Sequence, residues 1–130
     1  MPVRDLEWFG GDCSLLHVWS NRGANGIDGV IASAIGVAIA TRQKTLVLLG
    51  DVAFLHDSSS LTALADRDVD LKIVVTDNDG GGIFSTLPQR GVDGFESVFG
   101  TPHGLDPAAI AQAMGVPAST ISSIDELKNT

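Results

Sequence analysis

The alternation of apolar and polar positions divides the chain into short apolar runs and longer stretches with helical spacing. Three runs have the length and the β-branched content of strands: LLHVW at 15–19, TLVLL at 45–49 and LKIVV at 71–75. Three stretches show the spacing of helices: 26–41, about 58–67 and 107–115. This order predicts an α/β fold, a parallel sheet with helices on both faces and right-handed crossovers. Ligands of such sheets bind beyond the carboxyl ends of the strands.

Residues that favour helix N-termini stand near the expected helix starts. We expect Asn25 to cap the first helix and Asp57 or Ser58 the second, with Asp106 before Pro107 and Ser122 or Ser123 starting the later two. Residues 77–104 are rich in glycine, with interspersed aromatic residues and no sustained period. Because loops of this length in compact domains are usually functional, this segment is the first place to look for a site.

Composition narrows the class of protein. A chain of 130 residues with 44% hydrophobic and 5% aromatic residues predicts a single domain with a mainly aliphatic core. The net charge of −8 argues against nucleic acid or an anionic membrane surface as a partner. The apolar stretch at 29–40 is too short to span a bilayer, so it predicts a helix buried by packing.

The chain ends point to a piece of a cytoplasmic protein. Acidic residues near the N-terminus occupy the place of a signal peptide's apolar core, and Cys13, the only cysteine, has no partner for a disulfide. A reducing, cytoplasmic location is therefore expected. The sequence stops just after a last predicted helix begins, so we expect one domain, 1–130, truncated at both ends.

Two polar residues directly follow two predicted strands. Asp51 follows the run at 45–49 and Asn78 follows the run at 71–75, close to the glycines at 80–82. Neighbouring parallel strands end at the same edge of a sheet, which would bring a carboxylate, an amide oxygen and free carbonyls together, with Asp51 exposed at that edge. With no cysteine or histidine among them, this oxygen set favours Mg²⁺ over zinc. The residues alone leave another reading open, in which Asp51 solvates a loop and DNDGGG is an ordinary turn.

The spacing of these residues resembles a known cofactor motif. GD at 50–51, Asn78 placed 27 positions beyond Asp51, and then Gly80 resemble the motif of thiamine diphosphate enzymes, with Val52 in place of the usual glycine and Asp77 in place of the first asparagine. Four longer stretches resemble the 2-succinyl-5-enolpyruvyl-6-hydroxy-3-cyclohexene-1-carboxylate (SEPHCHC) synthase family of menaquinone biosynthesis: SNRGANGIDG at 20–29, GDVAFLHD at 50–57, DNDGGGIFSTLPQ at 77–89 and FGTPHGLD at 99–106.

This resemblance implies a thiamine diphosphate and Mg²⁺ site, with Mn²⁺ as a possible substitute. By analogy with the family, Asp51, Asn78 and the Gly80 carbonyl would hold the cation against the cofactor diphosphate. The residues expected to contact the cofactor are Gly50, Val52, Ala53 and Gly81 through their backbone, Ile27 beneath it, and Ile83 and Phe84 beside its reacting ring. Arg4 and Arg22 would bind substrate carboxylates, and Leu87 would complete the apolar wall on the substrate side.

The resemblance also implies a reaction and partners. The family is a transferase that decarboxylates 2-oxoglutarate and adds the succinyl semialdehyde unit to isochorismate. The glutamate that activates the cofactor lies on a separate pyrimidine-binding domain of a second subunit, so we expect no catalytic residue within these 130 residues, and a homo-oligomer for the full enzyme. Two alternatives remain: an acetolactate-synthase-like carboligase domain, and a non-catalytic Mg²⁺-binding module of the receiver or flavodoxin kind. His103 is interpreted as a structural hydrogen-bonding residue.

Overall fold

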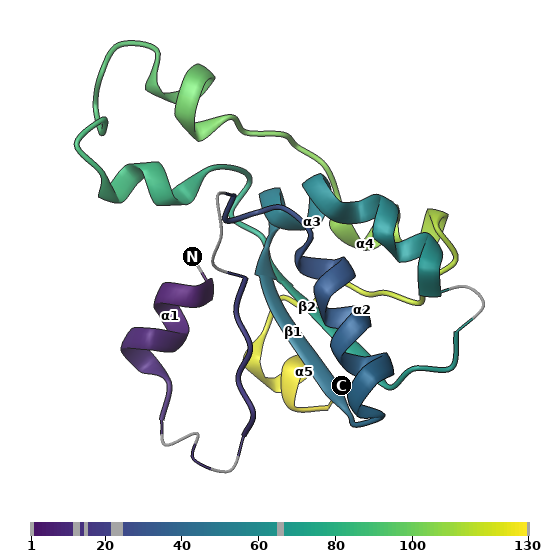
Figure 1. Ribbon diagram of the computed structural model, residues 1–130. Coiled ribbons are helices and arrows are strands. Elements are labelled where there is room, and N and C mark those ends of the chain that lie inside the picture. Colours follow the sequence, from purple (N-terminus) through teal and green to yellow (C-terminus); the bar gives the residue numbers. More distant parts are fainter. Residues whose placement is uncertain (1, 12–13, 15, 22–24, 65–66, 130) are drawn as a thin grey trace.

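The computed structural model describes residues 2–11, 14, 16–21, 25–64 and 67–129 (Figure 1). Strands β1 (Thr45–Gly50) and β2 (Leu71–Thr76) form a parallel sheet, paired from Thr45 with Leu71 to Gly50 with Thr76. Both strands therefore end at the same edge. The predictions of strands at 45–49 and 71–75 are confirmed.

Helices surround this sheet, which confirms the predicted α/β fold. The helices are α1 (Pro2–Phe9), α2 (Val30–Thr41), α3 (Asp51–Asp57), α4 (Pro107–Ala113) and α5 (Ile124–Lys128), and a 3-10 helix (Ser58–Leu64) continues α3. α2 and α3 pack on one face of the sheet, and α1 contacts β1 from the other side (Figure 1). None of the helices in the described part is long and apolar enough to cross a membrane.

The core lies between the sheet and the α2–α3 layer. It is built from Ile31, Ile35, Leu49, Ala53, Phe54, Leu61 and Ala111. Strand alternation places Val47 and Leu49 against this cluster, whereas Leu46 on the opposite face is 64% exposed. The core is mainly aliphatic, as the composition predicted, and α2 buries one face rather than its whole surface.

The start of α2 differs from the prediction. The helix begins at Val30 after Gly29, which has a left-handed φ of 65° and no side chain to cap the helix, so the expected cap at Asn25 is wrong. The N–H of Ala32 instead donates to Oδ2 of Asp57 at 2.9 Å, and the Ser60 hydroxyl donates to Oδ1 of the same carboxylate at 2.6 Å. A buried carboxylate at the end of α3 therefore caps the neighbouring helix and ties the two together.

Replacing Asp57 with alanine should lower the free energy of unfolding by about 1–3 kcal/mol, because the partly buried N–H of Ala32 and the Ser60 hydroxyl lose the carboxylate that accepts from both. Asp28 provides a matched control: its carboxylate is 60% exposed and lies 3.7 Å from His56 Nδ1. Asp28→Ala should change stability by less than about 1 kcal/mol. Urea unfolding of both variants measures the difference, and equal losses would contradict a capping role for Asp57.

Two other predicted elements need correction. Residues 16–19 form no strand, and Leu16 and Trp19 are more than 60% exposed, so the predicted strand at 15–19 is wrong over its described part. The helix expected at 58–67 begins earlier, at Asp51, directly after β1, and continues as a 3-10 helix to Leu64. The reason is local. A helix over DVAFLHD turns Ala53 and Phe54 toward the core, and their burial stabilises a helix that begins as soon as the strand ends.

Two helix starts agree with the sequence. Asp106 accepts from the N–H groups of Ala108 and Ala109 before Pro107 in the first turn, and Ser123 accepts from Glu126 at the start of α5. Between β2 and α4, residues 82–100 form an arm that extends away from the sheet (Figure 1). The arm contains a 3-10 helix (Gly82–Thr86) and a π-helical turn (Glu96–Gly100).

Candidate functional site

Asp51 lies at the carboxyl edge of the sheet, where β1 passes directly into α3. Gly50 keeps an extended backbone, with φ −83° and ψ 163°, and Asp51 is the first residue of the helix. Its side chain is only 2% exposed. The expectation of an exposed carboxylate is therefore wrong, because the chain after β2 and the segment around His103 both contact it.

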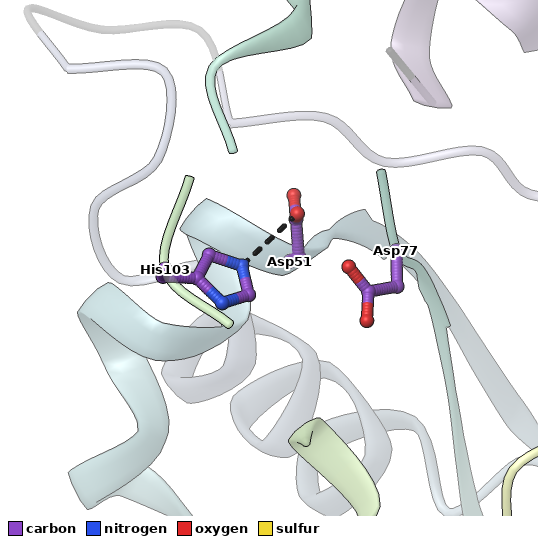
Figure 2. Close-up of side chains that lie close together, drawn as sticks. All are labelled: Asp51, Asp77 and His103. Carbon is purple, nitrogen blue, oxygen red and sulfur yellow. Dashed lines mark hydrogen bonds and ion pairs between the residues drawn. The ribbon is translucent and has the colours of Figure 1, made fainter. Parts of the chain in front are cut away.

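The Asp51 carboxylate accepts hydrogen bonds from both segments and from its own helix. Oδ1 accepts from the Val52 N–H at 2.8 Å. Oδ2 accepts from the N–H of Gly80 at 2.7 Å and from that of Asn78 at 3.3 Å. The His103 ring contacts the same oxygen, with Nε2 at 3.2 Å (Figure 2). One buried carboxylate thus joins β1, the glycine run after β2 and the segment before α4.

These contacts fix the charge of Asp51. Burial alone would raise the pKa of its carboxyl group, but hydrogen bonds from Gly80, Val52, His103 and Asn78 outweigh it and hold that pKa below its usual value. Asp51 is therefore ionised at neutral pH. An ionised carboxylate at a buried position is a strong candidate for binding a cation.

Asn78 and Gly80 lie beside this carboxylate, so the three residues expected to hold a metal meet in one hydrogen-bonded group. The Asn78 side-chain amide donates to the Gly80 carbonyl at 3.0 Å. Rotating that amide by half a turn would place its oxygen beside the carbonyl instead. The donor set is then a carboxylate, an amide oxygen and a backbone carbonyl, which are hard ligands suited to Mg²⁺ or Mn²⁺. The residues present fit the implied cation.

The glycine run approaches the end of the arm very closely. The Gly81 N–H donates to the Gly100 carbonyl at 2.7 Å. Gly80 has a φ of 133°, and a Cβ there would lie 2.1 Å from the Gly100 oxygen. Only glycine fits this backbone and this contact.

A polar hollow of about 120 Å³ opens beside the glycine run. It is lined by residues 78–82, Ser85, Phe95, Glu96 and Gly100. A wider, open depression of about 420 Å³ lies among residues 119–129. These residues include α5, which lies toward the other end of the strands (Figure 1). None of the residues predicted for the site lines that depression. The small hollow is therefore the relevant one, because it borders Asn78 and Gly80.

His103 is the contact that the sequence did not reveal. Figure 2 shows its ring turned toward Asp51, with Asp77 nearby, and ligand atoms of these three side chains lie within 4.8 Å of one another. The expectation that no histidine accompanies these oxygen atoms is therefore wrong, because His103 contacts Asp51. The interpretation of His103 as a hydrogen-bonding residue is confirmed. The only signal in the sequence was its place in the stretch FGTPHGLD.

The residues expected to contact a cofactor differ in position and burial. Val52 and Ala53 are in the first turn of α3, where the Val52 N–H already serves Asp51 and the Ala53 side chain is in the core. Ile27 precedes α2 and is 37% exposed. Gly50 ends β1 at the same edge as Asp51. Gly50, Val52 and Ala53 thus belong to the same strand-to-helix junction as Asp51.

The apolar residues of the arm form a small cluster. The Phe84 ring packs on Phe99 with centroids 5.4 Å apart, and Phe99 lies 5.8 Å from Phe95. Ile83 and Leu87 are each 38% exposed. Ile83 and Leu87 therefore offer an apolar surface beside the glycine run, and the packing of the three phenylalanine rings stabilises the arm.

Of the two arginines expected to bind substrate, Arg4 is the one among the described residues, and it lies outside the site. Arg4 lies on α1 and forms an ion pair with Glu7, one turn along the same helix. Among the described residues, Arg4 neither contacts Asp51 nor lines the small hollow. Arg22 lies outside the described residues.

Comparison with known families identifies the domain that these residues form. Residues 13–130 match the family model described as thiamine pyrophosphate enzyme, C-terminal TPP binding domain. The match includes Asp51, Asn78, Gly80 and His103. It covers every residue of the hydrogen-bonded group around Asp51.

Curated relatives share this part of the sequence. The chain is 49% identical over 113 residues to a 2-succinyl-5-enolpyruvyl-6-hydroxy-3-cyclohexene-1-carboxylate synthase of Chloroflexus aurantiacus, which covers 85% of this chain and 19% of the relative. A protein of the same name from Myxococcus xanthus is 48% identical over 110 residues, covering 82% and 19%. One from Staphylococcus aureus is 41% identical over 135 residues, covering 99% and 23%. The chain thus spans about a fifth of the length of these relatives.

Proposed function

This chain belongs to the thiamine pyrophosphate enzymes, as their C-terminal TPP binding domain, and we propose that it binds the cofactor diphosphate through a divalent cation. Asp51, Asn78 and the Gly80 carbonyl hold the cation, Mg²⁺ or Mn²⁺. The supporting observation is the buried Asp51 carboxylate, which is ionised and hydrogen-bonded to the N–H groups of Asn78 and Gly80. The family match argues against the receiver-like alternative.

The surrounding residues bind and shield the cofactor. Backbone groups of Gly50, Val52, Ala53 and Gly81 contact the diphosphate, and Ile27 supports the rest of the molecule. Thiamine diphosphate supplies, when bound, the electron sink needed to decarboxylate a 2-oxo acid. Apolar side chains of Ile83, Phe84 and Leu87 exclude water from that reaction.

The complete protein is proposed to be a SEPHCHC synthase. This step rests on relatives of that name that are 41–49% identical to this chain. The substrates would be 2-oxoglutarate and isochorismate, with Arg4 and Arg22 binding their carboxylates. The pyrimidine-binding domain of a second subunit would complete the site, so the working enzyme would be a homo-oligomer.

Thiamine diphosphate binding should depend strongly on a divalent cation. Calorimetric titration of the complete protein should show affinity that falls about 10–100-fold when EDTA removes Mg²⁺, because cation and cofactor are bound cooperatively at one site. Thiamine without its diphosphate is the control, and its binding should not respond to Mg²⁺. A cofactor affinity that is unchanged by EDTA would contradict the proposed cation site.

The choice of substrate is tested separately. Turnover of 2-oxoglutarate with isochorismate by the complete protein would support the proposed synthase activity. Turnover of pyruvate to acetolactate, with none from 2-oxoglutarate, would replace it with the acetolactate-synthase-like alternative. Neither result alters the cation site, which the binding experiment tests alone.

A further inference from the structure

We propose that His103 is a positioning residue for the cation site: it donates from Nε2 to Oδ2 of Asp51 and holds the carboxylate so that Oδ1 faces the cation. This inference rests on the proposed function, since it assumes that Asp51 is a ligand. His103 does not itself bind the cation in this arrangement. Its contribution is to fix the orientation of a residue that does.

The hydrogen bonds on the carboxylate are distributed unevenly. Oδ2 receives three donors, from Gly80, Asn78 and His103, at 2.7, 3.3 and 3.2 Å. Among the described residues, Oδ1 receives one, from Val52 at 2.8 Å. A carboxylate oxygen has two lone pairs, so Oδ1 retains acceptor capacity and Oδ2 does not. The cation ligand is therefore Oδ1, and the three donors on Oδ2 keep the group from rotating.

The protonation pattern of the His103 ring follows from its other nitrogen. The N–H of Leu105 donates to Nδ1 at 3.0 Å, so Nδ1 acts as an acceptor. In a neutral imidazole the proton must then be on Nε2, which faces Asp51 Oδ2. The ring is 13% exposed. Both ring nitrogens thus have partners in the orientation that the ring adopts.

Asp79 fixes the backbone that presents this ring. Its Oδ1 accepts from the N–H groups of His103 at 2.9 Å and Gly104 at 2.7 Å. Asp79 itself adopts a left-handed φ of 57° in the turn between Asn78 and Gly80. The turn that contains two proposed ligands is therefore joined to His103 through Asp79, and to Asp51 through the His103 ring. Partners of this kind orient metal ligands and commonly affect metal affinity.

Two substitutions separate the two bonds of the ring. Glutamine places an amide N–H near the position of Nε2 and can still donate to Asp51. Asparagine places an amide oxygen near the position of Nδ1, so it can accept from Leu105 but does not reach Asp51. The experiment measures Mg²⁺ affinity at saturating thiamine diphosphate, by calorimetry on the complete protein, for wild type, His103→Gln and His103→Asn, with the apo melting temperature of each.

We expect His103→Asn to weaken Mg²⁺ binding about 10–100-fold and His103→Gln to stay within about threefold of wild type. Wild-type affinity in both variants would overturn the proposal. An equal loss in both would also overturn it, because the effect would then follow the fold rather than the bond to Asp51. If the asparagine variant does not fold, His103→Ser, which also cannot reach Asp51, takes its place: a tenfold loss beside near-wild-type affinity in His103→Gln supports the proposal, and wild-type affinity in His103→Ser overturns it. Binding by wild type without any Mg²⁺ dependence would instead refute the proposed function.

Discussion

Replacing Asp51 with alanine should abolish the Mg²⁺-dependent stabilisation of the protein by thiamine diphosphate. With cofactor and cation at about 100 times the dissociation constant, the wild type should gain about 2.7 kcal/mol by mass action. The variant should gain almost nothing, because the one ionised ligand of the proposed site is gone. Thermal melts with and without Mg²⁺ and cofactor measure this difference.

The same substitution should also destabilise the protein without any ligand. Asp51 is buried, and alanine would leave the N–H groups of Val52, Asn78 and Gly80 without their acceptor. The expected loss is about 3 kcal/mol, since an orphaned donor is most costly where it is buried, as at Gly80, and less so where it is partly buried, as at Val52 and Asn78. An exposed carboxylate, as the sequence predicted, would have left the apo protein unchanged.

Asparagine at position 51 is the matched control. It keeps an acceptor oxygen for part of the N–H cluster, so Asp51→Asn should lose less apo stability than Asp51→Ala. It lacks the negative charge, so its ligand-dependent gain should fall nearly as far. If either variant keeps the full gain with Mg²⁺ and cofactor, Asp51 does not hold the cation. If alanine leaves the apo melting temperature unchanged, the hydrogen-bond cluster contributes nothing to the fold.

The sheet, and the meeting of Asp51, Asn78 and Gly80 at its edge, could be predicted from the sequence because each depends on short-range rules. The runs at 45–49 and 71–75 are mainly apolar, contain β-branched residues and are flanked by polar residues or glycine, and the strands extend only one residue beyond each. Parallel strands that pair in register end together, which brought Asp51 and Asn78 close although they are 27 positions apart along the chain. The convergence of the proposed ligands follows from this geometry alone.

The run at 15–19 shows where such rules fail. Leu16, Val18 and Trp19 have strand propensity, but a strand also needs a paired neighbour, and the described part of this segment has none. The early start of the helix at Asp51–Asp57 was not predicted because only Gly50 separates it from the apolar run of β1. Without a longer stretch of turn residues to mark the boundary, the sequence placed the start of the helix too late.

The contact between His103 and Asp51 lies beyond any local pattern. The two residues are 52 positions apart, and the arm between them has no periodicity from which its path could be inferred. The contact forms because Asp79 binds the backbone at His103 and Gly104, and because glycine allows close passage at Gly80. The burial of Asp51 depends on the same closure, which explains why its exposure was predicted wrongly.

Replacing Gly80 with alanine should therefore disrupt the site even though it removes no side chain. The φ of 133° at Gly80 is a conformation that side chains rarely adopt, and the added Cβ would lie 2.1 Å from the Gly100 oxygen and 3.1 Å from that of Thr101. Backbone strain of about 1–3 kcal/mol and overpacking of about 1–3 kcal/mol should both act against folding. Relief requires the glycine run to move away from the arm, which would displace the N–H that binds Asp51 and the carbonyl proposed as a ligand.

Gly91 offers the control that separates the two effects. It also has a positive φ, 81°, but a Cβ there would meet nothing within 4 Å. Gly91→Ala should therefore lose about 1–2 kcal/mol from strain alone and keep wild-type affinity for Mg²⁺ and thiamine diphosphate. Gly80→Ala should lose more stability, and its cation affinity should fall sharply, as measured by urea unfolding and calorimetry. Equal losses of stability with unchanged affinity in both variants would show that the close contact between Gly80 and Gly100 does not shape the site. Backbone strain alone would then account for both results.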